Sequence, residues 1–220
     1  MEARIHIIVG HYGSGKTEFA INYALGLREC YARVYLVDLD IVNPYFRTND
    51  VKEKLEAMGL SVIASPYASS NVDVPSLPSD IHRVFADRDA AVVFDVGGDD
   101  DGAIALGRYK QFFDKEEPEM LFVMNVFRPM TATAEQIKDM VADIEATSRQ
   151  KVTALVNSSN LAGLTTKEEV IKGQGITKEA SRITGIPLRY TTVTKEVAET
   201  LPEENRESLF IIKRFMALNF

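Results

Sequence analysis

Short apolar segments alternate with amphipathic segments along most of the chain. Seven runs rich in Val, Ile and aromatic residues have the length of strands, and most of them are apolar at successive positions rather than at every second one. Continuous apolar runs of this kind are typical of strands that helices cover on both faces. The expected strands lie at 5–10, 33–40, 60–65, 90–98, 119–127, 151–157 and 186–193.

Segments with the helical spacing of apolar residues separate these runs. They lie at 16–30, 50–59, 78–87, 102–114, 131–149, 166–184 and 205–218. Strands that alternate with helices indicate parallel strands joined by right-handed crossovers. The sequence has neither an internal repeat nor a low-complexity linker. The pattern therefore predicts an α/β fold, a single P-loop domain over 1–220 with a mostly parallel sheet and helices on both faces.

The composition narrows the functional classes. The chain has 220 residues, a formal net charge of −7 and a calculated pI near 5.1, which argues against a nucleic-acid partner. No apolar run approaches the roughly 20 residues of a membrane-spanning helix, and the N-terminus lacks the layout of a signal peptide. The single cysteine, Cys30, rules out an internal disulfide framework. We therefore expect a cytoplasmic protein.

The segment from Gly10 to Thr17 reads Gly-His-Tyr-Gly-Ser-Gly-Lys-Thr and lies between an expected strand and an expected helix. It matches the phosphate-binding loop Gly-x-x-x-x-Gly-Lys-[Ser/Thr], whose backbone N–H groups surround an anion. In this chemistry Lys16 bridges the β- and γ-phosphates and has a catalytic role, while the Thr17 hydroxyl is a ligand of Mg²⁺. The expected nucleotide-binding residues are Gly10, His11, Tyr12, Gly13, Ser14, Gly15, Lys16, Thr17 and Glu18.

Carboxylates that suit a metal ion end two of the expected strands. Asp38 and Asp40 close the second strand, and Asp95 closes a later one in the Walker-B manner. The carboxyl ends of parallel strands meet at the edge of the sheet where such folds bind ligands. We expect Asp95 to hold Mg²⁺ directly or through water. We also expect Gly97 and Gly98, which follow it, to leave room for a γ-phosphate.

The stretches "GHYGSGKT", "LVDLDIVNP", "VVFDVGG" and "VTALVNSS" resemble, in order and spacing, the MinD/ParA/Mrp-type P-loop ATPases of the SIMIBI class. This resemblance covers the chain from Ile5 to about Thr194. It implies that Asp40 orients or activates the attacking water, that Asp38 helps to form the Mg²⁺ shell and that Asn157 hydrogen-bonds adenine. Because the chain lacks the Asn-Lys-x-Asp stretch that selects guanine there, ATP is favoured over GTP.

One position departs from this family. The MinD/ParA subgroup has a lysine directly after the first glycine of the loop, which reaches the partner's phosphates across an ATP-sandwiched dimer. His11 takes that place here, and a neutral imidazole does not replace an ammonium group that is always charged. A nucleotide-dependent homodimer is therefore left open.

These features support more than one function. The first is a cytoplasmic Mg-ATP-dependent ATPase whose hydrolysis of ATP to ADP switches its conformation for a protein partner of unknown identity. The alternative is a P-loop kinase or an ATP-dependent ligase resembling dethiobiotin synthetase, which His11 and the polar stretch 65–80 favour. A third is a regulatory module that senses ATP without hydrolysing it.

Three further segments bear on these alternatives. The resemblance places a nucleotide-sensitive loop at 41–50, after Asp40. The acidic run Asp99–Asp101 either caps the helix that follows or belongs to a second switch loop. The expected last helix, 205–218, is apolar around so much of its circumference that we expect it to dock on the sheet rather than on a membrane.

Overall fold

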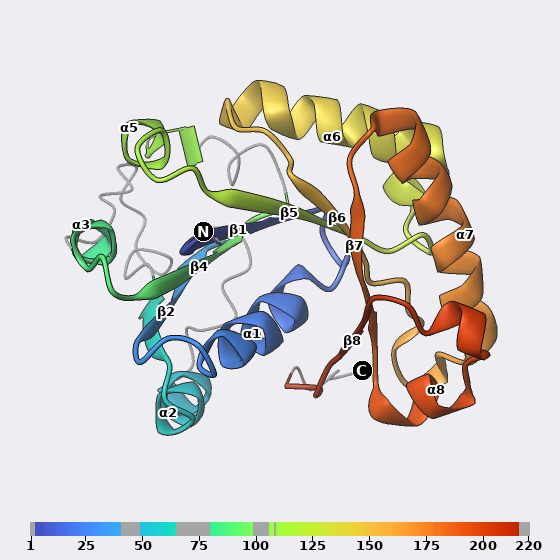
Figure 1. Cartoon of the computed structure of the whole chain (residues 1–220), viewed down its shortest axis with the longest axis horizontal. Coiled ribbons are helices and arrows are strands. Elements are labelled where there is room, and N and C mark those ends of the chain that lie inside the picture. Colours follow the sequence, from blue (N-terminus) through green and yellow to red (C-terminus); the bar gives the residue numbers. More distant parts are fainter. Residues whose placement is uncertain (1–2, 41–48, 65–79, 99–105, 108, 216–220) are drawn as a thin grey trace.

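An eight-stranded, all-parallel sheet forms the centre of the molecule, with helices on both of its faces (Figure 1). The structure is a computed structural model, and it describes residues 3–40, 49–64, 80–98, 106–107 and 109–215. The strand order is β3-β2-β4-β1-β5-β6-β7-β8. The strands are β1 Ile5–Val9, β2 Val34–Leu39, β3 Ser61–Ala64, β4 Ala91–Val96, β5 Glu119–Met124, β6 Ala154–Asn157, β7 Leu188–Val193 and β8 Leu209–Ile211. The expected fold class is confirmed.

The helices follow the strands in the order that the sequence pattern predicts. Two of them begin with a capping box, in which Thr133 pairs with Gln136 and Thr166 with Glu169. The helices are α1 Lys16–Leu27, α2 Asn49–Ala57, α3 Asp80–Ala86, α5 Lys110–Phe113, α6 Ala134–Ser148, α7 Lys167–Thr184 and α8 Lys195–Thr200, with short 3₁₀ turns η2 Pro129–Thr131, η3 Ala162–Leu164 and η4 Glu203–Asn205.

Two apolar clusters fill the space between the sheet and its helices. Side chains alternate along a strand, so Ile5 and Ile7 of β1 face one cluster and Ile8 faces the other. The first cluster receives side chains of α3, α5, α6 and α7, and the second receives those of α1 and α2. Every residue of β1, β2 and β4 is buried, which explains their continuous apolar runs.

The topology gathers the expected site residues at one edge of the sheet. β1 lies in the middle, paired with β4 on one side and β5 on the other, and its chain continues into the phosphate-binding loop. In the register of β2 and β4, Asp38 is the partner of Asp95. Because all strands are parallel, their carboxyl ends lie on the same edge as this loop.

The prediction of a helix over 205–218 is wrong for the residues described. Leu209–Ile211 instead forms β8, which extends the sheet beside β7, and the chain from 212 to 215 has no regular structure. Leu209 packs against one apolar cluster and Phe210 against another, as neighbouring residues of a strand do. Four successive apolar residues at 209–212 fit a buried strand as well as a helix, and the pattern alone does not separate the two.

Smaller differences concern other elements. The described part of the expected helix 102–114 contains the four-residue helix α5, and α8 was not expected. Residues 41–48 of the expected nucleotide-sensitive loop and the run Asp99–Asp101 fall outside the described residues, as does most of the polar stretch 65–80.

Candidate nucleotide-binding site

Glycines determine the path of the loop between β1 and α1. Gly10, Gly13 and Gly15 have φ angles of 153°, 72° and 90°, which residues with a side chain rarely adopt. A Cβ atom on Gly10 would lie 2.1 Å from the carbonyl oxygen of Val123. The loop is closed by a hydrogen bond from the Ser14 N–H to the His11 carbonyl at 3.1 Å. Glycine is therefore required here by both conformation and space.

Helix α1 begins at Lys16, directly after this loop, as the sequence predicts. The free N–H groups of its first turn and the positive end of its dipole consequently lie at the loop. Ser14 is 1% exposed, and its hydroxyl has no hydrogen-bond partner among the described residues. A cradle of glycine backbone with an unpaired buried hydroxyl suits a phosphate group.

Lys16 and Asp40 face one another beside the loop. The Nζ atom of Lys16 lies 3.8 Å from Oδ2 of Asp40, and both side chains are less than a tenth exposed. Asp38 positions Asp40, since its Oδ1 accepts a hydrogen bond from the Asp40 N–H at 2.9 Å. The two aspartates thus have different tasks, one supporting the backbone and the other placed next to the cation.

Asp95 lies with Thr17 at the carboxyl end of β4. Its carboxylate accepts a hydrogen bond from the Thr17 side chain, and it is 1% exposed. Burial raises the pKa of Asp95 to about 6, although the charge of Lys16 and the hydrogen bond from Thr17 act in the opposite direction; nearby Asp40 raises it further. Its Oδ1 atom has no hydrogen-bond partner among the described residues.

The pair of Thr17 and Asp95 fits a magnesium ion. A hydroxyl and a carboxylate are oxygen ligands of the kind that Mg²⁺ prefers, and Mg²⁺ bound with a nucleotide takes few ligands from the protein. Within the described ranges no group of three or more His, Cys, Asp or Glu side chains could hold a metal ion.

Gly98 contacts the loop itself. A Cβ atom on Gly98 would lie 2.5 Å from the backbone nitrogen of Tyr12 and 2.6 Å from the carbonyl oxygen of Gly10. The sequence predicts that this glycine leaves room for a γ-phosphate. In the structure its small size lets the end of β4 approach the phosphate loop.

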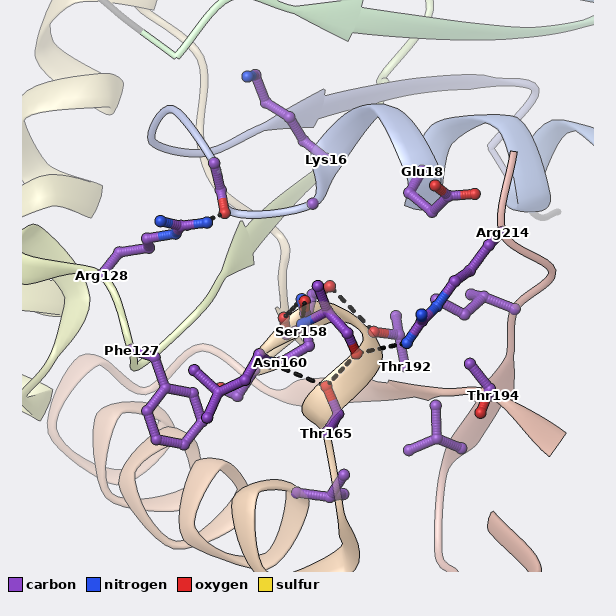
Figure 2. A pocket seen from close by; sticks show the side chains of 18 of the residues that line it. Lys16, Glu18, Phe127, Arg128, Ser158, Asn160, Thr165, Thr192, Thr194 and Arg214 are labelled. Atoms are coloured by element: carbon purple, nitrogen blue, oxygen red, sulfur yellow. Dashed lines mark hydrogen bonds between the residues drawn. The ribbon is translucent and has the colours of Figure 1, made fainter. Parts of the chain in front are cut away.

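A cavity of about 620 Å³ extends from the loop across the carboxyl ends of β5, β6 and β7 (Figure 2). Its far end is bounded by the turn η3 and by the chain after β8. Cavities of this size hold ligands such as nucleotides. Of the expected site residues, those that line it are Tyr12, Gly13, Gly15, Lys16, Thr17, Glu18 and Asp40.

The loop after β6 forms the floor of the far part of the cavity. The Thr192 hydroxyl donates to Ser158 Oγ at 3.0 Å, and Asn125 fixes the loop by donating to the Asn160 carbonyl at 3.0 Å. The side chain of Asn125 also accepts from the Asn160 N–H. Sequence reasoning missed Asn125; the signal was one polar residue inside the apolar run Met120–Phe127.

Asn157 and His11 are expected site residues that do not line the cavity. Asn157 is 1% exposed; its Oδ1 accepts from the Ser159 N–H at 3.1 Å, and its Nδ2 has no hydrogen-bond partner among the described residues. His11 turns to its own loop, where Nδ1 lies 3.1 Å from the Tyr12 carbonyl oxygen. Contacts of these two side chains with a nucleotide stay predictions.

The chain after β8 is bound to helix α1. Asn22 donates to the carbonyl of Lys213 at 2.9 Å and accepts from its N–H at 2.8 Å. Glu18, expected at the nucleotide, accepts a hydrogen bond from the Phe215 N–H at 2.6 Å. Arg214 donates to the Ala162 carbonyl at 2.5 Å, across the far end of the cavity.

Known proteins resemble this chain in structure but not in sequence. No protein-family model matches the chain, and no curated protein sequence matches it. Similar solved structures include the FtsY cell division protein of Thermotoga maritima, with a TM-score of 0.55 and 19% identity over 96% of this chain and 65% of that one. Chloroplast FtsY of Physcomitrella patens gives 0.57 and 16%, over 87% of this chain and 59% of that one.

A third neighbour is the signal recognition particle receptor FtsY of Elizabethkingia anophelis in complex with GDP. Its TM-score is 0.53 at 17% identity, over 98% of this chain and 61% of that one. The chain thus spans less than two thirds of the length of these proteins. The likeness shows the fold alone, an α/β fold with a parallel sheet and helices on both faces. In addition, none of the described helices is long and apolar enough to cross a membrane.

Proposed function

We propose that the protein is a magnesium-dependent nucleoside triphosphatase and that its nucleotide is ATP. One observation carries this proposal. The glycine cradle of the loop, the Lys16–Asp40 pair and the Thr17–Asp95 pair lie together at one end of a large cavity. These groups bind phosphate oxygens, stabilise negative charge and place a carboxylate near the transferring phosphoryl group.

Each residue has a separate task in the proposed reaction. Lys16 and the loop N–H groups hold the phosphates, and Asp40 orients the water that attacks the γ-phosphorus atom. Thr17 and Asp95 would hold Mg²⁺, with Asp38 supporting them; when bound, the ion neutralises charge on the phosphate oxygens. ADP leaves as the bond between its β-phosphate oxygen and the γ-phosphorus breaks, and inorganic phosphate is the second product.

Two observations support ATP over GTP. The chain has no Asn-Lys-x-Asp after β6, where it reads Asn-Ser-Ser-Asn. Among the described residues that line the cavity, the acidic ones are Glu18 and Asp40, which lie at the loop rather than in its far part. Guanine presents N–H donors that a carboxylate would accept, whereas adenine suits the hydroxyls and backbone groups found there. The GDP in one FtsY neighbour makes GTP the alternative to test.

We also propose that hydrolysis acts as a switch for a protein partner. Large apolar side chains stand exposed around the cavity: Tyr12 is 66% exposed, Leu164 80% and Leu161 43%. Exposed apolar groups at the mouth of a nucleotide site are suited to a protein that binds in one nucleotide state. A second copy of this chain is one candidate for that partner.

Steady-state phosphate release from Mg-ATP and Mg-GTP tests the reaction. We expect slow turnover with ATP that is abolished in Asp40→Ala and Lys16→Ala, with nucleotide binding weakened only in Lys16→Ala. Lys138→Ala, on the exposed side of α6, is the control. Absence of phosphate release in the wild type, or full activity of Asp40→Ala, would contradict the proposal. Release without any added acceptor also argues against a kinase or ligase.

The partner state is tested by sedimentation velocity of Asp40→Ala with Mg-ATP, following protein and nucleotide absorbance together. Doubling of the mass with bound ATP would identify a nucleotide-dependent homodimer. A monomer that carries ATP would exclude it under these conditions and direct the search to other proteins.

A further inference from the structure

Arg128 places a second cation at the phosphate-binding loop. It follows β5 in the turn that leads to η2, and its Nε donates a hydrogen bond to the Gly13 carbonyl at 3.1 Å (Figure 2). A Cβ atom on Gly13 would lie only 3.0 Å from this Nε and 3.1 Å from Cζ. Glycine is favoured at position 13 by its φ of 72°, and the guanidinium group packs directly against it. Arg128 and Gly13 both line the cavity.

The turn that carries Arg128 is rigid. The Thr131 hydroxyl, fully buried, donates to the Asn125 carbonyl at 2.7 Å, and the Arg128 N–H donates to the same carbonyl at 3.0 Å. The Asn125 side chain accepts from the Phe127 N–H at 3.0 Å, and Pro129 restricts the backbone of the preceding residue, Arg128, to the extended conformation that it adopts. The backbone of Arg128 is thus held in place, while its side chain is exposed.

The cavity offers no equivalent cation within the part of the chain that the structure describes. The cationic side chains that line it are Lys16, Arg128 and Arg214. Lys16 already faces Asp40, and Arg214 is bound to the Ala162 carbonyl at the far end. His11, which occupies the position of the lysine found in MinD/ParA proteins, turns to the Tyr12 carbonyl and does not line the cavity.

Arg128 is chemically suited to a phosphoryl group. A guanidinium group is always charged, and its planar fork of N–H donors matches two phosphate oxygens at once. The hydrogen bond to Gly13 uses Nε, and the two Nη groups have no hydrogen-bond partner among the described residues. We propose that Arg128 is a catalytic residue that acts from within the same chain and stabilises the charge that develops on the transferring phosphoryl group. This inference rests on the nucleotide site proposed above.

A purely structural role makes different predictions. If Arg128 only holds the loop through the Gly13 carbonyl, Arg128→Gln should restore function, because a glutamine amide can donate to a carbonyl without a charge. If the charge acts on the transition state, Arg128→Gln should behave like Arg128→Ala, and Arg128→Lys should retain part of the effect. Arg182→Ala is the control, since Arg182 is exposed and pairs with Glu179 on α7.

The decisive experiment compares the affinity for ADP with that for ADP plus aluminium fluoride, an analogue of the transferring phosphoryl group, in the presence of Mg²⁺. Loss of one such charge-stabilising group typically costs about 10²–10³ in rate, and a transition-state analogue should report a comparable loss. We expect Arg128→Ala and Arg128→Gln to lower the ratio of the two affinities by roughly 100-fold. The affinity for ADP alone should change by less than about threefold.

The possible outcomes are distinct. An unchanged ratio in Arg128→Ala, or full rescue by Arg128→Gln, would overturn the role of Arg128 and leave the nucleotide site intact. Equal losses for ADP and for the analogue would show ground-state binding and would also overturn it. If the wild type binds neither, the proposed function fails and this role fails with it. Circular dichroism verifies that each variant is folded.

Discussion

At the scale of single residues, the site buries charged side chains, which costs free energy. A ligand bound beside them would offset that cost. Asp95 is the clearest case, because it is buried next to Lys16 and Thr17 and its pKa is raised to about 6 mainly by burial. Functional sites often retain such groups although they reduce the stability of the ligand-free protein.

The burial of Asp95 predicts that the free energy of unfolding of the protein without metal and nucleotide depends on pH. The folded state holds the Asp95 proton more tightly than the unfolded chain, whose carboxyl has an ordinary pKa near 3.8. The stabilising contribution of Asp95 to the free energy of unfolding is therefore at its maximum below pH 3.8, and it is lost as the pH rises through about 6. At 1.36 kcal/mol per pKa unit the loss is about 3 kcal/mol. Urea unfolding at pH 4 and pH 7 should show that Asp95→Asn lacks this loss; the same pH difference in both proteins would contradict the assignment.

Gly98 yields a second prediction at this scale. Its Cβ position overlaps the backbone of the loop, which has no flexible side chain to move aside. Gly98→Ala should destabilise the protein by about 1–3 kcal/mol and weaken nucleotide binding. Gly175 in α7 is the matched control, because nothing lies within 4 Å of its Cβ position. In thermal unfolding, Gly175→Ala should stabilise by about 0.5–1 kcal/mol. Equal effects of the two substitutions would refute the close contact.

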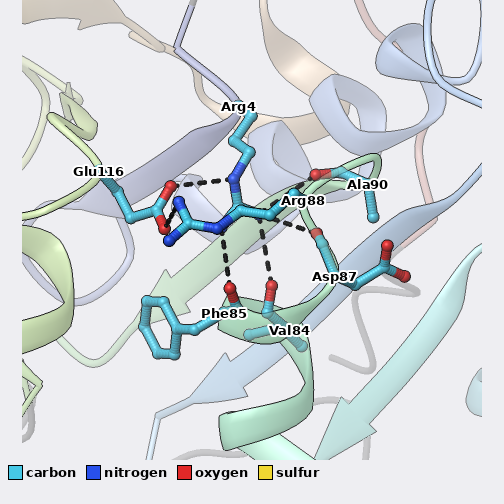
Figure 3. A network of polar contacts seen from close by, with 7 residues as sticks. All are labelled: Arg4, Val84, Phe85, Asp87, Arg88, Ala90 and Glu116. Carbon is cyan, nitrogen blue, oxygen red and sulfur yellow. Dashed lines mark hydrogen bonds and ion pairs between the residues drawn. The ribbon is translucent and has the colours of Figure 1, made fainter.

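At the scale of elements, a largely buried arginine joins the start of β1 to the end of α3 (Figure 3). Arg4 donates to the carbonyl groups of Val84, Phe85, Asp87 and Ala90, at 3.2–3.3 Å, and to the carboxylate of Glu116 at 2.9 Å. It thereby satisfies carbonyls at the end of a helix that no intrahelical N–H can reach. Helix α3 is consequently held against the central strand.

Replacement of Arg4 should therefore cost far more than replacement of a surface arginine. Arg4 is 12% exposed, and its removal leaves the buried Glu116 carboxylate and several carbonyls without this donor. We expect Arg4→Gln to lower the free energy of unfolding by about 3 kcal/mol. Arg88 pairs with the same Glu116 but is 65% exposed, so Arg88→Gln should cost less than about 1 kcal/mol. Denaturant unfolding of both variants measures the difference, and similar losses would contradict this account.

The chain after β8 gives another prediction for an element. Its backbone is bound by Asn22 of α1 on both the donor and the acceptor side of Lys213. Asn22→Ala should raise amide hydrogen exchange at Lys213 by at least about tenfold without changing that of β1. Asn22→Asp keeps the acceptor for the Lys213 N–H and should have a smaller effect. Unchanged exchange in Asn22→Ala would mean that other contacts hold this segment.

At the scale of the whole molecule, the parts of the site that the sequence could predict are those built from neighbouring residues. The loop and the start of α1 follow from glycines and lysine in one short segment, and Asp38 and Asp95 were located because each ends an apolar strand. The sheet followed from continuous apolar runs.

Other parts of the site depend on contacts between distant residues. Arg128 and Gly13 are 115 residues apart, and only the pairing of β1 with β5 brings them together. In the same way, Gly98 meets the loop because β4 is the other neighbour of β1. No local pattern marks either contact. The last segment was predicted incorrectly because its four apolar residues fit two structures until their packing is known.

The central claim is that the loop between β1 and α1 binds the phosphates of ATP. Equilibrium titration of the wild type and Lys16→Ala with ATP and GTP, in the presence of Mg²⁺, tests it most directly. We expect the wild type to bind ATP more tightly than GTP and Lys16→Ala to lose at least about tenfold in affinity, which is the effect of removing roughly 1.4 kcal/mol of phosphate binding. Absence of binding, or equal affinity in Lys16→Ala, would contradict the claim, and tighter binding of GTP would overturn the choice of nucleotide.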